Sequence, residues 1–281
     1  MTERMKVAAS GIEKLIRLLD IVPLGSDVYV ARSELPPSRP TPFGGELMAQ
    51  SLRAAAATTD GALFPHSLHA SFLRAGDAGQ DLLIQVERLG DGRSFSRRQV
   101  TARQGDRVLL TMTASFQRDE PSAEFQVPAP TVAAPPGDDF VSDVDGNGVV
   151  LGLDMIDRSR EGVPPDQAVY LAWVRSQGEL PSDRILHSCI MAYLSDMGAP
   201  AIAATAIGLR AGGPDSSPAG SARTTSLDHA MWFHRPGRCD DWLLVSAVPL
   251  STVGSRGLML GSLHDRSGRH LASFTQEMLI R

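Results

Sequence analysis

The chain has 281 residues and a mass of 30.0 kDa, a length that fits two ordinary domains or one large one. Hydrophobic residues make up 42% of the chain and charged residues 21%, so it can bury a core, and the formal net charge of −5 argues against nucleic acid or an anionic membrane as its main partner. Two cysteines, Cys189 and Cys239, are too few for a disulfide framework and lack zinc-site spacing, so we expect a reducing compartment and no metal.

The first predicted element is a short amphipathic helix over residues 11–19. Its apolar side chains recur at helical spacing, at Ile12, Leu15, Ile16 and Leu19. Charged residues before and within this stretch interrupt any apolar region that a signal peptide would need. No run approaches the roughly 18 apolar residues of a membrane span. We therefore expect a cytoplasmic protein without membrane insertion.

A second helix and four strands are expected next. Strong helix formers fill residues 46–57, after a proline-rich connector that ends at Gly44-Gly45. Strand-like segments follow at 66–74, 82–89, 94–103 and 107–117, with glycine-containing turns between the later ones.

The same order returns after residues 119–137, which have the proline and alanine content of a linker. The sequence predicts a strand at 168–175, a helix from about Asp183, a Gly/Ser/Pro-rich loop at 211–221, and strands at 224–234, 242–250, 255–263 and 270–280. We therefore divide the chain into an N-terminal module (1–119), a linker (120–140) and a C-terminal module (141–281).

Part of the first module is repeated in the second. Residues 70–76 read Ala-Ser-Phe-Leu-Arg-Ala-Gly, and residues 231–237 read Met-Trp-Phe-His-Arg-Pro-Gly. The second copy lies 161 residues after the first, counted from Arg74 to Arg235, and the strands that follow stay nearly in step. A chain that repeats its own layout indicates a duplicated domain, and the differences between the copies are then the place to look for function.

Each half therefore has one central helix followed by what we predict to be an antiparallel meander. The helix is expected to cover one face of the sheet, because the apolar alternation of the strands needs a partner. A helix wrapped by a curved antiparallel sheet is the hotdog architecture. The predicted fold is thus α+β, a double hotdog, with the two sheets joined edge to edge.

The second central helix carries a candidate catalytic carboxylate, Asp196. Ser182 is the predicted N-cap of this helix. Spacings of three, seven and eleven residues place Asp196 on the apolar stripe with Tyr193, Cys189 and Ile185. A structural role at the helix end is the alternative. Aligning the two helices on their Met-Ala pairs puts Arg53 opposite Asp196, so only one copy would hold the carboxylate.

Seven segments carry a family resemblance. They are Phe43–Glu46, His66–Arg74, Gly92–Arg98 and Met112–Gln117 in the first half, and Tyr193–Asp196, Leu227–Pro236 and Ala272–Glu277 in the second. Together they resemble the type II acyl-CoA thioesterases, the TesB-like family. The resemblance covers most of the chain outside residues 119–165 and 207–222. The string Asp-His-x-Met-Trp-Phe-His-Arg-Pro, at 228–236, is its most specific part.

The resemblance implies a double hotdog enzyme that hydrolyses acyl-CoA to free fatty acid and CoA without a cofactor. In that family an Asp, a Thr and a Gln hold and activate the attacking water, and the matching residues here are Asp196, Ser226 and Gln276. Ser226 keeps the hydroxyl but lacks the methyl group that restricts a threonine. Glu46 stands where the family usually has Gln. Backbone N–H groups near Gly44-Gly45 are the candidate oxyanion donors.

Other reactive side chains are assigned other roles. His229 and His234 lie in a strand and are expected to be structural histidines, and Cys189 is expected in the core. A basic cluster could contact the phosphates of CoA or could form a solvated strand face; it comprises Arg93, Arg97 and Arg98.

Two other functions stay open. One is a hotdog enoyl-CoA hydratase or dehydratase, which uses a differently placed acid and histidine pair, and the other is a catalytically degenerate acyl-CoA-binding protein. Asp196 within reach of Gln276 and Ser226, with no histidine there, would disfavour the hydratase. Binding of acyl-CoA without CoA release would favour the binding protein. Hotdog sheets tend to pair further, so we also expect a homo-oligomer, a dimer or larger.

Overall fold

The computed structural model describes residues 3–33, 40–135, 137, 153–159, 169–212 and 221–281. The helices are α1 (Glu3–Leu18), α2 (Gly44–Ala57), α3 (Arg184–Ser195) and α4 (Ala199–Thr205). The strands of the first half are β1 (Val22–Gly25), β2 (Val28–Ala31), β3 (Leu63–Phe72), β4 (Leu82–Asp91), β5 (Phe95–Gln104) and β6 (Arg107–Arg118). Those of the second half are β7 (Leu153–Asp157), β8 (Tyr170–Ser176), β9 (Arg210–Gly212), β10 (Ser221–Phe233), β11 (Leu243–Val253), β12 (Arg256–Asp265) and β13 (His270–Ile280).

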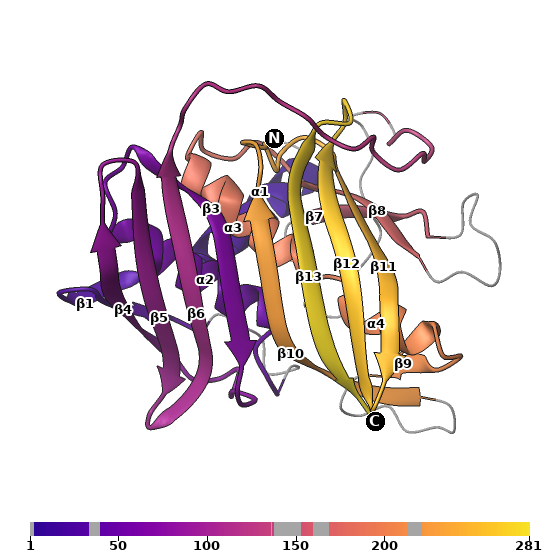
Figure 1. Ribbon diagram of the computed structural model, residues 1–281, viewed down its shortest axis with the longest axis horizontal. Coiled ribbons are helices and arrows are strands. Elements are labelled where there is room, and N and C mark those ends of the chain that lie inside the picture. The colour runs from indigo at the N-terminus through magenta and orange to yellow at the C-terminus, as the bar shows by residue number, and fades with distance from the viewer. Residues whose placement is uncertain (1–2, 34–39, 136, 138–152, 160–168, 213–220) are drawn as a thin grey trace.

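The strands form one 13-stranded sheet that runs across both halves. Its order is β1-β2-β4-β5-β6-β3-β10-β13-β12-β11-β8-β7, with β9 paired to β10 at the side. Figure 1 shows the two halves next to each other, with β3 and β10 in contact at the centre. The predicted edge-to-edge join is therefore confirmed, and it pairs two strands that would otherwise be exposed sheet edges.

The predicted meander holds for the last three strands of each half, which pair in sequence order, and is wrong for the first. The strand that follows each central helix does not pair with the next strand in sequence; β3 pairs with β6, and β10 pairs with β13. Alternation of apolar residues identifies the face that a strand buries but not its neighbour, so the sequence pattern could not reveal this order. The short strands β1, β2 and β7 and the helix α4 were also not predicted. The loop expected at 211–221 falls mostly on residues outside the described part of the chain.

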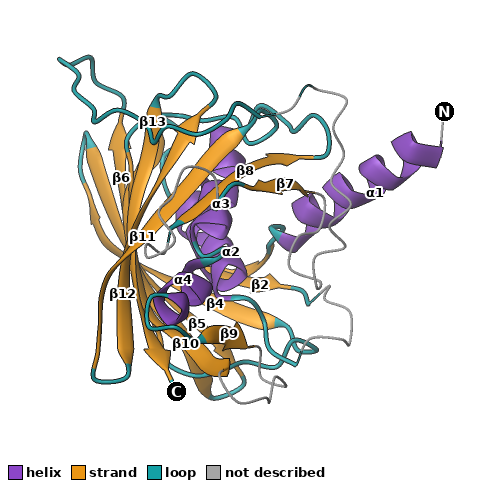
Figure 2. Cartoon of the chain, turned by 90° about the vertical axis from the view of Figure 1, so that its right-hand side faces the viewer, coloured by secondary structure: helices purple, strands orange, loops and turns teal. Residues whose placement is uncertain are grey.

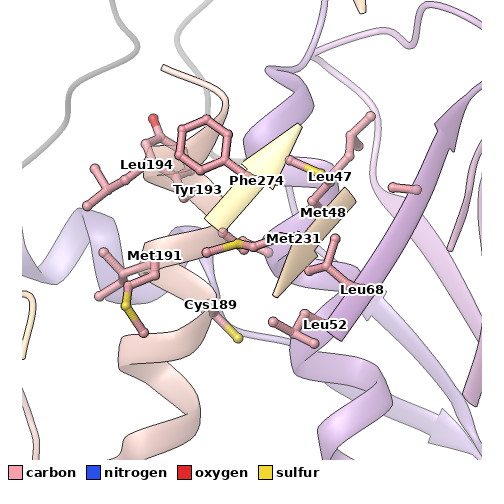
Figure 3. Close-up of a cluster of buried hydrophobic side chains, with 14 of the residues drawn as sticks. Leu47, Met48, Leu52, Leu68, Cys189, Met191, Tyr193, Leu194, Met231 and Phe274 are labelled. Carbon is pink, nitrogen blue, oxygen red and sulfur yellow. The ribbon is translucent and has the colours of Figure 1, made fainter. Parts of the chain in front are cut away.

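The two central helices pack against the same concave face of the sheet. Figure 2 shows α2 and α3 side by side within the curve of the strands. They run antiparallel, because the start of α2 contacts the end of α3 and Arg53 near the end of α2 binds Asp183 before the start of α3. Side chains from both helices meet Leu68 and Met231, which are paired across the central join, in one buried cluster (Figure 3).

The boundaries of two helices differ from prediction. α1 begins at Glu3 rather than near residue 11, because most of residues 3–10 are good helix formers. α3 is capped by Asp183, not Ser182: the Asp183 carboxylate accepts hydrogen bonds from the backbone N–H groups of Ile185, at 2.9 Å, and Leu186, at 3.3 Å.

Residues 119–135 contain neither helix nor strand. Residues 138–152 lie outside the described part of the chain, so the proposed module boundaries stay a prediction. Within the described residues, every helix is too short or too polar to cross a membrane.

The sequence repeat is a structural repeat. The N–H groups of Leu73 and Arg74 both donate to the carbonyl of Leu109, and those of His234 and Arg235 both donate to the carbonyl of Leu271. At the central join His69 pairs with Ala230, and these two residues are also 161 positions apart. A pair that the repeat maps onto itself marks a local twofold axis, so the two halves are related by rotation about the β3–β10 contact.

Candidate active site

Asp196 lies at the C-cap of α3 and is only 2% exposed. Its Oδ2 accepts a hydrogen bond of 2.8 Å from the backbone N–H of Gly45, in the first turn of α2. The two glycines at this helix start permit the approach: a Cβ on Gly44 would lie 2.7 Å from Asp196 Oδ2, and one on Gly45 would lie 2.6 Å from the carbonyl oxygen of Tyr193. The Gly-Gly sequence thus allows the first module to hold the carboxylate of the second.

Gln276 and Ser226 complete the cluster from neighbouring strands. Gln276, on β13, is fully buried, and its Nε2 donates to Asp196 Oδ1 at 2.6 Å and to Ser226 Oγ at 2.8 Å. Ser226, on β10, is partly exposed and lies at a β-bulge between Ser226 and Asp228. The structure therefore brings together all three residues that the sequence suggested. Ser226 reaches Asp196 through Gln276, and no direct bond between the two is present among the described contacts.

The electrostatics of this cluster suit a general base. Burial raises the pKa of the Asp196 carboxyl to about 6, although the hydrogen bonds from Gln276 and the Gly45 N–H act in the opposite direction. A carboxylate with a pKa near 6 is mostly ionised at neutral pH and accepts a proton more readily than an ordinary aspartate.

His229 was assigned a structural role from the sequence, yet it belongs to this cluster. It lies opposite Gln276 across β10 and β13, with Nδ1 at 3.1 Å from Gln276 Oε1. Its Nε2 is 2.9 Å from Ser195 Oγ, the last residue of α3. The alternation of β10 contained a signal, because His229 shares the inward face with Met231, and an inward histidine opposite an inward glutamine indicates a buried polar pair.

Two residues suggested for binding are occupied elsewhere. The Gly45 N–H donates to Asp196, so it is not free to act as the oxyanion donor that we expected in this region. Arg98 is fully buried and donates to Thr58 and Asp91, which removes it from the basic cluster proposed for CoA phosphates.

Glu46 and Cys189 lie in the interior. Glu46, the departure from the family pattern, accepts a hydrogen bond of 3.3 Å from Gln50 Nε2, one turn along α2. The expected core position of Cys189 is confirmed, because the residue is fully buried.

The first half has no carboxylate where the second has Asp196. Counted from the N-caps Phe43 and Asp183, Asp196 corresponds to Ala56 rather than to Arg53. Arg53 donates to Asp183 at 2.6 Å. The asymmetry that the sequence suggested therefore holds with either alignment. Among the described residues, no group of three or more His, Cys, Asp or Glu side chains is arranged to hold a metal ion.

Comparisons with known proteins identify the family of this chain. Residues 31–117 match the acyl-CoA thioesterase N-terminal domain, and residues 126–280 match the acyl-CoA thioesterase C-terminal domain. Mouse acyl-coenzyme A thioesterase 8 is 33% identical over 94% of this chain and 88% of its own length.

Two solved structures have the same fold over nearly the whole chain. A TesB protein of Mycobacterium avium subspecies paratuberculosis superposes with a TM-score of 0.81 and 29% identity, over 97% of this chain and 100% of its own. The acyl-CoA thioesterase II TesB2 of Mycobacterium marinum superposes with a TM-score of 0.77 and 32% identity, over 95% and 97%. The double hotdog fold is thereby confirmed, and the chain belongs to the type II acyl-CoA thioesterase family.

Proposed function

We propose that this protein hydrolyses acyl-CoA thioesters to a free fatty acid and CoA, using a water molecule activated by Asp196 and oriented by Gln276 and Ser226. Acyl-CoA hydrolysis is the reaction of the family to which the chain belongs. The observation that carries the assignment of residues is the buried Asp196 carboxylate, which accepts a hydrogen bond from Gln276 in a site shared by both modules.

The reaction needs one proton to move twice. Asp196 removes a proton from the water as the water oxygen forms a bond to the thioester carbonyl carbon. The carbon–sulfur bond of the tetrahedral intermediate then breaks, and the proton held by Asp196 passes to the departing sulfur. The products are the carboxylic acid and the CoA thiol, so atoms and charges balance.

Gln276 and Ser226 would set the direction of the attack. Because Ser226 Oγ accepts from Gln276 Nε2, its own hydroxyl proton is free to donate to the water or to the substrate oxygen. The Gln276 amide holds the carboxylate and the hydroxyl at the same time, which fixes both groups before substrate binds.

The test replaces Asp196 with asparagine and measures thiol release from acyl-CoA substrates of several chain lengths. We expect turnover to fall about 100-fold to 10,000-fold, the usual contribution of a general base. Asp183→Asn is the matched control, because it makes the same chemical change at the opposite end of α3 and asparagine caps helices well. Full turnover by a folded Asp196→Asn enzyme would refute the assignment.

The enoyl-CoA hydratase alternative is not favoured. We expected no histidine beside Asp196, Gln276 and Ser226 in a thioesterase, and His229 is present there. However, His229 bonds to Gln276 and Ser195 rather than to Asp196, and it is 1% exposed. A histidine buried behind the glutamine has no route to a substrate. The degenerate binding protein is tested by the same thiol assay, since it would bind acyl-CoA and release no CoA.

We also propose that the protein forms a homo-oligomer of two or more copies. Support comes from exposed large apolar residues on the sheet of the second half. Leu260 and Val248 are paired across β12 and β11, and Trp232 lies on β10, which β13 separates from β12. Light scattering coupled to size-exclusion chromatography measures the mass in solution, and a single 30.0 kDa species would contradict this proposal.

We also propose a cytoplasmic location, because the two cysteines are buried and unpaired, as is usual in a reducing compartment. Cell fractionation tests it.

A further inference from the structure

The proposed mechanism depends on one orientation of the Gln276 amide. Its Nε2 must face Asp196 and Ser226, because a flipped amide would place Oε1 against a carboxylate oxygen, with no hydrogen between two acceptors. The bonds to Asp196 and Ser226 use the two hydrogens of Nε2 and leave Oε1 pointing away from the site. A group behind the amide that donates to Oε1 would therefore stabilise the working orientation.

His229 is in that place. Its Nδ1 lies 3.1 Å from Gln276 Oε1. Because Oε1 accepts only, the hydrogen of a neutral imidazole must be on Nδ1. Nε2 is then an acceptor, and Ser195 Oγ lies 2.9 Å from it.

Ser195 has two acceptors within reach, the imidazole and the Ala192 carbonyl oxygen at 2.8 Å, but one hydroxyl proton. If Ser195 donates this proton to His229, each hydrogen bond in the series from Ser195 through His229 and Gln276 to Asp196 has one donor and one acceptor.

We propose that His229, held by Ser195 as the Nδ1–H tautomer, is a positioning residue that fixes the Gln276 amide in its catalytic orientation. This inference rests on the proposed function of Gln276. His229 contacts neither Asp196 nor Ser226 in the described hydrogen bonds, so it acts through Gln276 and not on the substrate.

The surroundings of His229 keep the imidazole neutral and in place. The ring is stacked on Phe274, with centroids 5.7 Å apart and planes 12° apart. Burial lowers the pKa of His229 to about 4, despite the opposing effect of the Gln276 oxygen. A neutral imidazole carries one N–H hydrogen. The donor and the acceptor of each hydrogen bond from Ser195 through His229 to Gln276 are therefore the same over the whole neutral pH range.

The first module provides an independent comparison. At the position that corresponds to the His229–Gln276 pair, β3 and β6 pair Leu68 with Ala114, both fully buried and apolar. The module without the glutamine also lacks the histidine. If His229 only filled space inside the sheet, there would be no reason for both it and its cross-strand partner Gln276 to differ from the corresponding residues of the first module.

The main test is a double-mutant cycle on turnover. His229→Phe keeps the ring shape and the stacking on Phe274 but removes the donor, and we expect kcat to fall about tenfold with KM changed little, as for a group that supports only the transition state. His229→Asn retains an N–H donor near the Nδ1 position and should recover most of kcat. His234→Phe is the matched control, an exposed histidine just after β10 that bonds to Ser273, and should leave kcat unchanged.

Two measurements separate positioning from plain structural support. In a Gln276→Ala background, His229→Phe should cause no further loss of kcat, because the amide that it positions is absent. Nitrogen NMR of the wild-type protein should show the hydrogen of His229 on Nδ1. Additive losses, an Nε2–H tautomer, or full kcat in a folded His229→Phe enzyme would each overturn the inference. Full activity of Gln276→Ala alone would instead refute the role that the proposed mechanism gives to Gln276.

Discussion

The two modules of this chain have the same backbone arrangement and differ in the side chains that they bury. Each has a bulge at the same place in the strand after its central helix, between Pro65 and Ser67 in β3 and between Ser226 and Asp228 in β10. Next to that bulge the first module buries Leu68 against Ala114, and the second buries His229 against Gln276. Bulges often lie beside active sites. The duplicated frame therefore offers two equivalent pairs of buried positions beside a bulge, and polar side chains fill the pair in the second module.

The first module has a buried polar group as well, but of a different kind. Arg98 lies within the module and donates to the Thr58 hydroxyl, the Thr58 carbonyl and Asp91, so its charge is satisfied by the module's own side chains and backbone. The Asp196 carboxylate has no cation beside it in its described hydrogen bonds, and its pKa is raised. We infer that the first module uses a buried charge for stability and the second keeps one available for proton transfer.

Among the variants that test this comparison of the modules, replacing Gln276 should have the largest effect. Gln276→Ala should lower kcat about 100-fold to 1,000-fold, the usual cost of removing a preorganised hydrogen-bond donor from an active site. Circular dichroism and thermal unfolding should show a folded protein. A loss below threefold in a folded variant would mean that the polar pair of the second module does no chemistry.

Arg98→Met should produce the opposite pattern. Removing the guanidinium leaves Thr58 without its donors, and the free energy of unfolding should drop by about 3 kcal/mol, as for other broken buried networks. The measurement is chemical denaturation, with kcat assayed below the transition. Unchanged stability, or a loss of kcat without a loss of stability, would contradict the division of roles between the modules.

The pH dependence of activity tests the raised pKa directly. The active form of Asp196 is the carboxylate, and its raised pKa means that activity should decline below about pH 6, well above the pH at which an ordinary aspartate is protonated. On the acid side kcat/KM should fall about tenfold per pH unit. A flat profile down to pH 4.5 would show that no group of this kind limits the reaction.

The smallest effects should come from a matched pair of glycines. A Cβ on Gly76 would lie 2.6 Å from a methyl carbon of Leu109, and one on Gly237 would lie 2.6 Å from the equivalent carbon of Leu271. Gly237→Ala should destabilise the protein by about 1 kcal/mol, since a flexible leucine can move. Gly76→Ala should destabilise it more, because its Cβ would also lie 2.9 Å from Pro42 Cγ, which cannot move as easily. Thermal unfolding compares the two variants, and equal shifts would contradict this difference in packing.

The sequence was informative where a pattern has a single physical meaning. The apolar stripe placed Asp196 in the interior, and the repeat at Arg74 and Arg235 correctly indicated a duplicated module. The edge-to-edge join followed from the need to cover exposed sheet edges. Strand order was not predictable, because a run such as 63–72 indicates which face is buried and not which strand lies beside it. The use of the Gly45 N–H by Asp196 was equally hidden, since it depends on antiparallel helices that bring together two residues 151 positions apart.

The role of His229 shows a different limit. Its residue type and strand position were read correctly, but the choice between a structural and a functional histidine depends on the partner across the sheet. That partner, Gln276, is fixed by the register of β10 against β13, and the bulge at Ser226 shifts this register by one residue. Counting along either strand alone could not have matched the two residues.

The hydrogen bond from Gly45 to Asp196 has a consequence for how the site is assembled. Because the carboxylate of one module is held by the backbone of the other, two separate modules would have to meet in solution to complete it, and dilution would take the site apart. Joining them in one chain replaces that encounter with an intramolecular contact, for which short tethers give effective concentrations of about millimolar. The site therefore stays complete however scarce the enzyme is.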